Sequence, residues 1–196
     1  MYPSYTYWTF LYAVSIKSAK KCQKLPVVLS KDDVEMIISN TKNKKHRLLL
    51  SLGCGSGLRV SEVVNLKSDD IDIKRKLIYV KQAKGNINRI TLLPDKLLDD
   101  MKENILIGKK YIFESERGGK LSVRTAQLIF KRALKKAGIL KRATFRTLRH
   151  SFAIHLLKNG IDVRYVQELF GHQNIRTTQI YTHVTNMALR NIKSPL

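Results

Sequence analysis

Apolar residues recur at helical spacing from about residue 30 onward. Ser30 and Asp33 form a capping-box pattern ahead of an apolar stripe, which predicts a first helix. The leucines of 48–52 predict a second, mostly buried helix. Glycines within 53–57 follow these leucines, and we expect them to end the helix in a tight turn.

Short runs of β-branched and aromatic residues occupy the middle of the chain. They lie at 71–73, 77–80, 87–93 and 111–113. A Gly-Asn pair at 85–86 separates the second run from the third and is a typical turn signal. These runs predict a small antiparallel sheet.

The second half of the chain returns to helical patterns. The clearest helix begins after Ser122 and ends at Gly138. Its apolar stripe consists of Val123, Ala126, Ile129, Phe130, Ala133, Leu134 and Ala137. Further helices are expected at 144–159, at 162–171 and at 174–181. The fold class is therefore expected to be mixed α and β, and mostly α.

The length of 196 residues suits one domain with a substantial core. Residues 1–25 change from aromatic to basic before Pro26, so we interpret them as an arm and linker, and 26–196 as the domain. The first eleven residues do not resemble a secretory signal, and no apolar run is long enough to span a membrane. A cytoplasmic location is expected.

The charge of the chain changes this picture most. Lys and Arg total 37 against 15 Asp and Glu, a formal net charge of +22. Such an excess favours a polyanionic partner, above all nucleic acid. A merely basic protein, or one that lies on an anionic membrane, is the alternative interpretation.

Cofactor and metal chemistry find little support in the sequence. Cys22 and Cys54 have neither CxxC spacing nor a histidine partner nearby, and His150 and His155 are five residues apart. The glycines of 53–57 follow a helical pattern and lack GxGxxG spacing, so they do not indicate a dinucleotide site. We expect neither a cofactor nor a metal.

Four motifs occur in order at 57–62 (GLRVSE), 147–153 (TLRHSFA), 169–172 (LFGH) and 177–181 (TTQIY). Together they resemble the tyrosine recombinases, or phage-type integrases, and most closely their Xer-like branch. The resemblance runs from about residue 25 to residue 196. It implies the catalytic-domain fold of that family, a helical bundle with a small antiparallel sheet.

The resemblance also implies the activity. Tyr181 is expected to attack a DNA phosphodiester, form a 3′-phosphotyrosine link and release a 5′-hydroxyl, which makes the chain a site-specific DNA recombinase or integrase. Neither ATP nor a metal is required by this chemistry. The implied partner is double-stranded DNA, bound by a homotetramer on two DNA sites, with no small-molecule substrate and no membrane.

The family motifs assign roles to individual residues. Arg59 and Arg149 are expected to clamp the scissile phosphate, and His172 to donate to it. Lys84, at the hairpin tip, matches the family's general acid better than Lys81. Without the resemblance, Lys84 would be read as a solvated turn lysine, His172 as a helix cap, and Arg59 equally as a surface arginine or as a ligand of an anion. Arg149 lies on a mostly apolar helix, so we expect it to be drawn inward.

Arg146 departs from the family pattern, which commonly has histidine three residues before the second arginine. A guanidinium stays protonated, so Arg146 can bind phosphate or hold Tyr181 but cannot easily act as a base. His150 and His183 are interpreted as supporting residues. Although Tyr181 could be a core residue, polar neighbours and the nearby arginines, which are expected to lower the pKa of its phenol, favour the nucleophile.

Two rival functions stay open. A type IB topoisomerase shares this chemistry but rejoins the same strand. A non-catalytic DNA-binding protein is the other, because 162–171 and 174–181 could form a helix-turn-helix. The arm at 1–25 is too short for the helical DNA-clamping domain usual in the family, so a truncated or minimal recombinase is expected.

Overall fold

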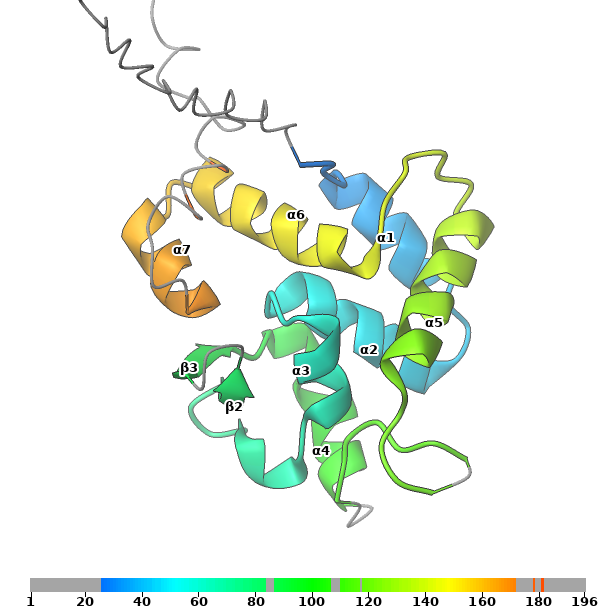
Figure 1. Ribbon diagram of the computed structural model, residues 1–196, viewed down its shortest axis with the longest axis vertical. Helices are drawn as coiled ribbons and strands as arrows, with labels where there is room; N and C mark the ends of the chain where they lie inside the picture. The colour runs from blue at the N-terminus through cyan, green and yellow to red at the C-terminus, as the bar shows by residue number, and fades with distance from the viewer. Residues whose placement is uncertain are drawn as a thin grey trace, which may run out of the picture.

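The computed structural model describes residues 26–83, 87–106, 110–116, 118–171, 178 and 181. Helices dominate it, and a small sheet lies at one side (Figure 1). The helices are α1 (Lys31–Ser39), α2 (Lys44–Gly55), α3 (Val60–Asn65), α4 (Leu98–Leu106), α5 (Val123–Lys136), α6 (Phe145–Lys158) and α7 (Val163–Phe170), with short 3-10 turns η1 (Ser68–Asp70) and η2 (Asp95–Leu97). The strands are β1 (Ile71–Asp72), β2 (Leu77–Ala83) and β3 (Ile87–Leu92).

Helix α2 forms the centre of the core. Its leucines at 48, 49, 50 and 52 are fully buried, and the helix packs against α1, α3, α5 and α6. Gly53 lies inside α2, where a Cβ atom would come within 3.0 Å of Leu148 Cδ1 and Phe145 Cζ on α6. The first glycine of 53–57 therefore permits close packing of α2 on α6, and the helix ends only at Gly55.

Antiparallel pairing in the order β1-β2-β3 confirms the sheet predicted from the first three runs. The fourth run, 111–113, was predicted wrongly as a strand. Tyr111 makes only an isolated bridge with Lys67, while Ile112 and Phe113 enter the core. The apolar character of this run therefore reflects burial and not strand pairing.

The capping and glycine signals located four helices correctly. Ser30 caps α1, Ser122 caps α5 and Asp162 caps α7 through side-chain oxygens that accept backbone N–H bonds. Gly160 follows α6 with a positive φ. Helices α3 and α4 were not predicted, because six residues in α3 show too little of a helical period.

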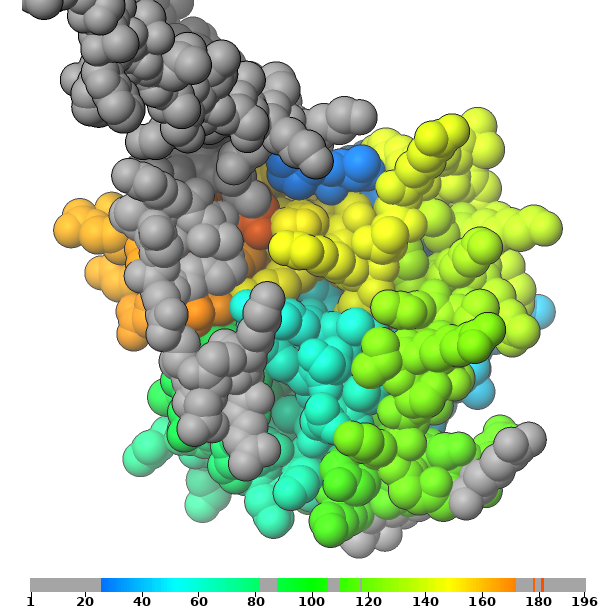
Figure 2. All heavy atoms as spheres, in the orientation of Figure 1, coloured from blue at the N-terminus to red at the C-terminus, as the bar shows by residue number. Residues whose placement is uncertain are grey.

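Helices α3 and α5 pack side by side on the face shown in Figure 2. The exposed residues of α5 include several cations: Arg124, Lys131, Arg132, Lys135 and Lys136. Helix α6 crosses above α2, and α7 lies beside β3 (Figure 1). The start of α3, strand β3, α6 and the end of α7 therefore meet in one region. Among the described residues, every helix is too short or too polar to cross a lipid bilayer.

Candidate active site

A buried carboxylate organises three arginines from different elements. Glu62 on α3 accepts a bond from Arg59 Nη1 at 2.7 Å and one from Arg89 Nη2 at 2.6 Å. Arg149 Nη1 on α6 lies 3.6 Å from Glu62 Oε2. We call Arg59, Arg89 and Arg149 the arginine cluster. Three guanidiniums around one carboxylate leave an excess of positive charge, which suits an anionic ligand such as a phosphate.

Arg149 is held rigidly at the centre of this cluster. Its side chain donates from Nη1 to the Gly57 carbonyl at 2.6 Å and from Nη2 to the Phe170 carbonyl at 2.9 Å. The guanidinium also lies over the Phe170 ring, 4.0 Å from the ring centroid. A guanidinium has five N–H donors, so these two bonds fix its orientation and leave donors for a further acceptor.

Burial is the main influence on the charge of Arg149. It lowers the pKa of this guanidinium to about 9, helped by the charges of Arg89 and Arg59. This value is above neutrality, so Arg149 stays positively charged at pH 7. The sequence-based expectation that Arg149 is drawn inward is confirmed, because the residue is only 4% exposed.

Gly57 makes the approach of Arg149 possible. Its φ is +61°, and a Cβ atom there would lie 2.5 Å from Phe152 Cδ1 and 2.8 Å from Phe170 Cε1. Any other residue would meet both rings in a strained backbone conformation. The glycine of the GLRVSE motif thus places a carbonyl against Arg149 and starts the turn into Arg59.

Burial alone would raise the pKa of the Glu62 carboxyl. The charge of Arg89, the hydrogen bond from the Arg59 N–H and the charge of Arg149 outweigh burial, so the pKa lies below its ordinary value. Glu62 is therefore ionised at neutral pH. These contacts make Glu62 a structural support of the arginine cluster.

Arg89 was missed by the sequence reasoning. It extends inward from β3, bonds Glu62, and donates from Nη1 to the Leu169 carbonyl at 2.5 Å. A Cβ atom at Gly171, whose φ is +58°, would lie 2.8 Å from Arg89 Cδ. The alternation of β3 gave the opposite signal, because apolar Ile90 and Leu92 would be expected inside, whereas Arg89 and Thr91 are buried and Ile90 and Leu92 are 46% and 44% exposed.

Tyr181 lies in a buried aromatic group beside the arginine cluster. Its side chain is 2% exposed and meets the Phe170 ring edge-on, with centroids 6.0 Å apart. Phe170 thus touches both the Arg149 guanidinium and the tyrosine ring. Tyr181 is therefore buried as a core residue would be, and it lies near enough to Arg149, Arg146 and Arg59 for their charges to act on its phenol.

The expected low pKa of Tyr181 was wrong. Burial raises the pKa of the phenol, and this effect outweighs the opposing charges of Arg149, Arg146 and Arg59. The arginines act in the direction expected from the sequence, but they do not overcome the loss of solvent around a phenolate. Tyr181 is therefore a neutral phenol at pH 7.

His150 hydrogen-bonds the tyrosine. Its Nδ1 lies 2.7 Å from Tyr181 Oη, and the two ring centroids are 5.5 Å apart. Burial lowers the pKa of His150 to about 4, with smaller contributions from the charges of Arg146 and Arg149. The imidazole is therefore neutral at pH 7. Arg146 itself is exposed one turn earlier on α6.

Three residues singled out in the sequence, Lys84, His172 and His183, lie outside the described residues. Lys81, the alternative to Lys84, is described. Its ammonium pairs with Asp70 Oδ1 at 2.7 Å, and the hydrogen bond with Asp70 raises the pKa of Lys81. A lysine held in this way is a weaker acid than an unpaired one.

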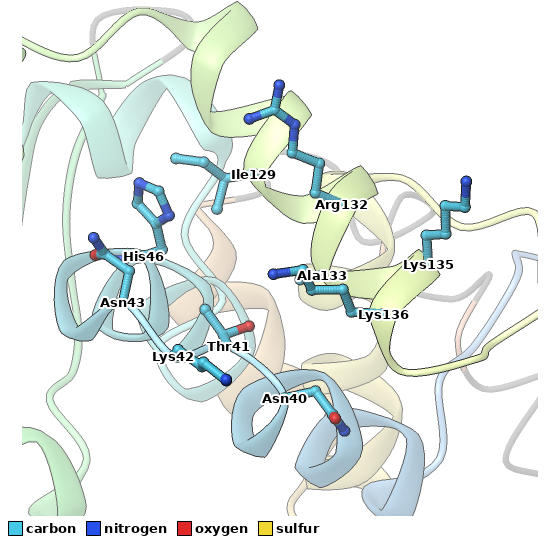
Figure 3. Close-up of a pocket in the computed structure, with 10 residues that line it drawn as sticks. All are labelled: Asn40, Thr41, Lys42, Asn43, His46, Ile129, Arg132, Ala133, Lys135 and Lys136. Atoms are coloured by element: carbon cyan, nitrogen blue, oxygen red, sulfur yellow. The ribbon is translucent and has the colours of Figure 1, made fainter.

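A separate hollow lies between the α1–α2 turn and α5 (Figure 3). It has a volume of about 590 Å³ and shares no lining residue with the arginine cluster. Cations line much of it, among them Lys42, Arg132 and Lys136, and the Lys136 side chain extends across it (Figure 3). Among the described His, Cys, Asp and Glu residues, no three come together as a metal site requires.

Known proteins resemble this chain in sequence. The model of the phage integrase family matches residues 27–187. Tyrosine recombinase XerA of Thermococcus kodakarensis is 41% identical over 186 residues, which cover 91% of this chain and 65% of that protein. Tyrosine recombinase XerD of Listeria innocua is 37% identical over 194 residues, with the same two coverages. The chain thus spans less than two thirds of the length of these relatives.

Solved structures agree. A crystal structure of XerA recombinase superposes with a TM-score of 0.77 at 32% identity, covering 90% of this chain and 66% of that one. XerH site-specific recombinase bound to a palindromic difH substrate, in a post-cleavage complex, gives a TM-score of 0.77 at 24% identity, covering 92% and 57%. The second likeness shows the fold alone.

Proposed function

The chain belongs to the phage integrase family, the tyrosine recombinases, and from this premise we propose that it is a site-specific DNA recombinase. One observation carries the proposal: Arg59, Arg149 and Tyr181, from three separate sequence motifs, gather around Phe170 and Glu62. A buried nucleophile next to an excess of guanidiniums suits the cleavage of a phosphodiester.

Tyr181 is the proposed nucleophile. Its Oη attacks phosphorus, the bond from phosphorus to the 5′-oxygen breaks, and a 3′-phosphotyrosine forms. The 5′-hydroxyl of a partner strand then attacks the same phosphorus and releases the tyrosine. Because the bond energy is kept in the protein–DNA link, no nucleotide cofactor is needed.

Arg59 and Arg149 are proposed to hold the non-bridging oxygens of the phosphate. Arg149 is oriented in advance by two backbone carbonyls, and Arg59 by Glu62. Donors fixed before the reaction need no reorganisation as negative charge builds on the phosphate oxygens. Arg59 is the more accessible of the two, because 30% of its side chain is exposed.

Lys84 and His172 complete the proposed site by their sequence positions. Lys84 would protonate the leaving 5′-oxygen, and the engagement of Lys81 with Asp70 supports this choice. His172 directly follows Gly171, the C-cap of α7, which lies against the Arg89 side chain. We propose that His172 donates a hydrogen bond to the phosphate. Arg146 is proposed as a further cation facing the phosphate.

We further propose that 26–196 form the catalytic domain, that 1–25 are an arm and linker, and that four protomers act on two double-stranded DNA sites. The net charge of +22 supports a DNA partner.

A nicked DNA substrate that traps the covalent intermediate tests the function. Incubation with candidate recombination sites should give a protein–DNA adduct that resists denaturation. Tyr181→Phe removes one oxygen and should abolish the adduct while DNA binding persists. An adduct of equal yield with this variant would exclude Tyr181 as the nucleophile, and relaxation of supercoils without strand exchange would favour a topoisomerase.

A further inference from the structure

The proton of Tyr181 needs an acceptor within the site. The phenol is neutral because burial raises its pKa, so attack on phosphorus requires that the proton leave. Arg146, where the family commonly has histidine, keeps its own proton and cannot take another. The inference that follows rests on the recombinase function proposed above.

The described structure offers one neutral nitrogen at the right place. His150 Nδ1 lies 2.7 Å from Tyr181 Oη, within the distance needed for direct proton transfer. His150 follows Arg149 directly on α6, so the helix that positions the phosphate-binding guanidinium also positions the imidazole. The Arg149 guanidinium and the Tyr181 ring both contact Phe170 at the end of α7.

We propose that His150 is the catalytic base that accepts the proton of Tyr181. As the bond from Oη to phosphorus forms, the phenol proton moves to Nδ1 of His150 and the bond to the 5′-oxygen breaks. The departing 5′-oxygen takes its proton from Lys84. On rejoining, the attacking 5′-hydroxyl gives its proton back to Lys84, and the imidazolium returns its proton to Oη as the tyrosine leaves phosphorus, so both protons are restored in each cycle.

The electrostatics of the site make this transfer depend on bound DNA. Burial and the charges of Arg146 and Arg149 keep His150 unprotonated in the free protein, so it is available as an acceptor but is a weak base. A phosphate between the arginines offsets their charge and raises the basicity of the imidazole. Meanwhile the phenol becomes more acidic as Oη bonds to phosphorus. The proton therefore moves during the attack and not before it.

The His150→Asn variant distinguishes a catalytic base from a residue that only supports Tyr181. The asparagine Oδ1 occupies the position of Nδ1 and still accepts a hydrogen bond, but it is not protonated near neutral pH. DNA binding should persist, while single-turnover cleavage of bound DNA falls by about 100-fold or more, the usual loss of a general base. His155→Asn is the matched control, because His155 is on the same helix and contacts Leu29 instead of Tyr181.

The dependence of this loss on pH gives the decisive readout. The charged groups that face the pair are Arg146 and Arg149 on α6 and Arg59 before α3. Because the pKa of Arg149 is about 9, the rates are compared between about pH 6 and pH 8, where this guanidinium stays mostly charged. Without a base, cleavage should rise with hydroxide, so the ratio of wild-type to variant rate should shrink as pH increases. Lys84 is present in both proteins, so its effect on the rate cancels in this ratio.

Two results would overturn the role of His150 while leaving the recombinase function intact. The first is cleavage by His150→Asn within about threefold of wild type. The second is a deficit of equal size at every pH, which a purely structural contact would give. His150→Gln, which moves the acceptor away from Oη, should be no faster than the asparagine variant. Absence of an adduct in the wild-type protein would instead contradict the recombinase function itself.

Discussion

Arg89 and Glu62 form a buried ion pair of 2.6 Å that joins strand β3 to the first turn of α3. Their side chains are 3% and 6% exposed, and Arg89 also bonds the Leu169 carbonyl near the end of α7. Within the described part of the chain, Arg89 Nε has no hydrogen-bond partner. One carboxylate thus holds together the strand that leads from the hairpin tip, the first arginine of the site and the end of α7.

Replacing Glu62 by Gln should destabilise the fold strongly. Three guanidiniums would then share a buried site without a carboxylate, and breaking a buried pair typically costs about 3–5 kcal/mol. The free energy of unfolding from denaturant titration measures the loss. Asp99→Asn is the control, because Asp99 is exposed and pairs only at the surface with Lys102, a contact worth about 0–1 kcal/mol. Equal small effects in both variants would show that Glu62 is dispensable to the cluster.

Arg59→Ala should lower cleavage of bound DNA by on the order of 100-fold, because a fixed donor to the transition state is lost. Arg59 suits this test better than Arg149, whose loss would also leave two carbonyls without their donor. Single-turnover cleavage at saturating protein gives the rate. Arg75→Ala, at an exposed arginine between β1 and β2, should cleave at the wild-type rate. A weaker affinity with unchanged cleavage would make Arg59 a simple backbone contact.

DNA affinity should fall steeply with salt. Binding by many lysines and arginines releases counterions, and six or more phosphate contacts reduce affinity on the order of 1000-fold between about 50 mM and about 200 mM salt. Fluorescence anisotropy with a labelled duplex measures the slope. A nearly flat response would argue against DNA as the partner of this highly basic chain.

Much of the fold follows from local sequence signals. Ser30, Ser122 and Asp162 mark helix starts because a side-chain oxygen at this position accepts a hydrogen bond from a free backbone N–H of the first turn. Each is a cap in the structure. Helix α3 was missed because its six residues show too little of a period. Residues 111–113 look like a strand because burial and strand pairing favour the same residue types.

The candidate site depended less on local sequence signals than the fold did. Arg59, Arg149 and Tyr181 were identified by family motifs, whereas Arg89 belongs to none of the motifs used and became visible only through its contacts with Glu62 and Leu169. The pKa of Tyr181 was misjudged because nearby arginines can be read from a sequence, but the burial that outweighs them cannot. The partnership of His150 with Tyr181 likewise depends on how α6 meets the chain near Tyr181.

The stability of the DNA-free protein should depend on pH through the titration of His150. Its pKa is lowered in the folded state to about 4, from an ordinary 6.5, so the unfolded chain takes up a proton first as pH falls. Stability from this group is therefore present above about pH 6.5 and is lost as pH falls toward 4. Because the side chain is only partly buried, we expect a contribution of about 1–2 kcal/mol.

The free energy of unfolding of wild type and His150→Asn, measured without DNA at several pH values, isolates that contribution. The variant should lose less stability than wild type between about pH 6.5 and pH 4.5, because it lacks the group that titrates. His155→Asn should also lose less stability than wild type as pH falls, because burial lowers the pKa of His155 as well, so the two variants separate the contributions of the two histidines. Parallel pH curves for wild type and His150→Asn would show that the imidazole is not kept neutral by the fold.

Lys84→Ala should slow cleavage sharply on ordinary DNA, because the leaving 5′-oxygen would lose its acid. On DNA with sulfur at the 5′-bridging position the same variant should cleave almost normally, since a thiolate leaves without a proton. Gel analysis of the covalent adduct from both substrates makes the comparison. Lys81→Ala is the matched control, because Lys81 precedes Lys84 on the same hairpin and pairs with Asp70. Equal slowing of Lys84→Ala on both substrates would assign Lys84 to DNA positioning and return Lys81 as the candidate acid.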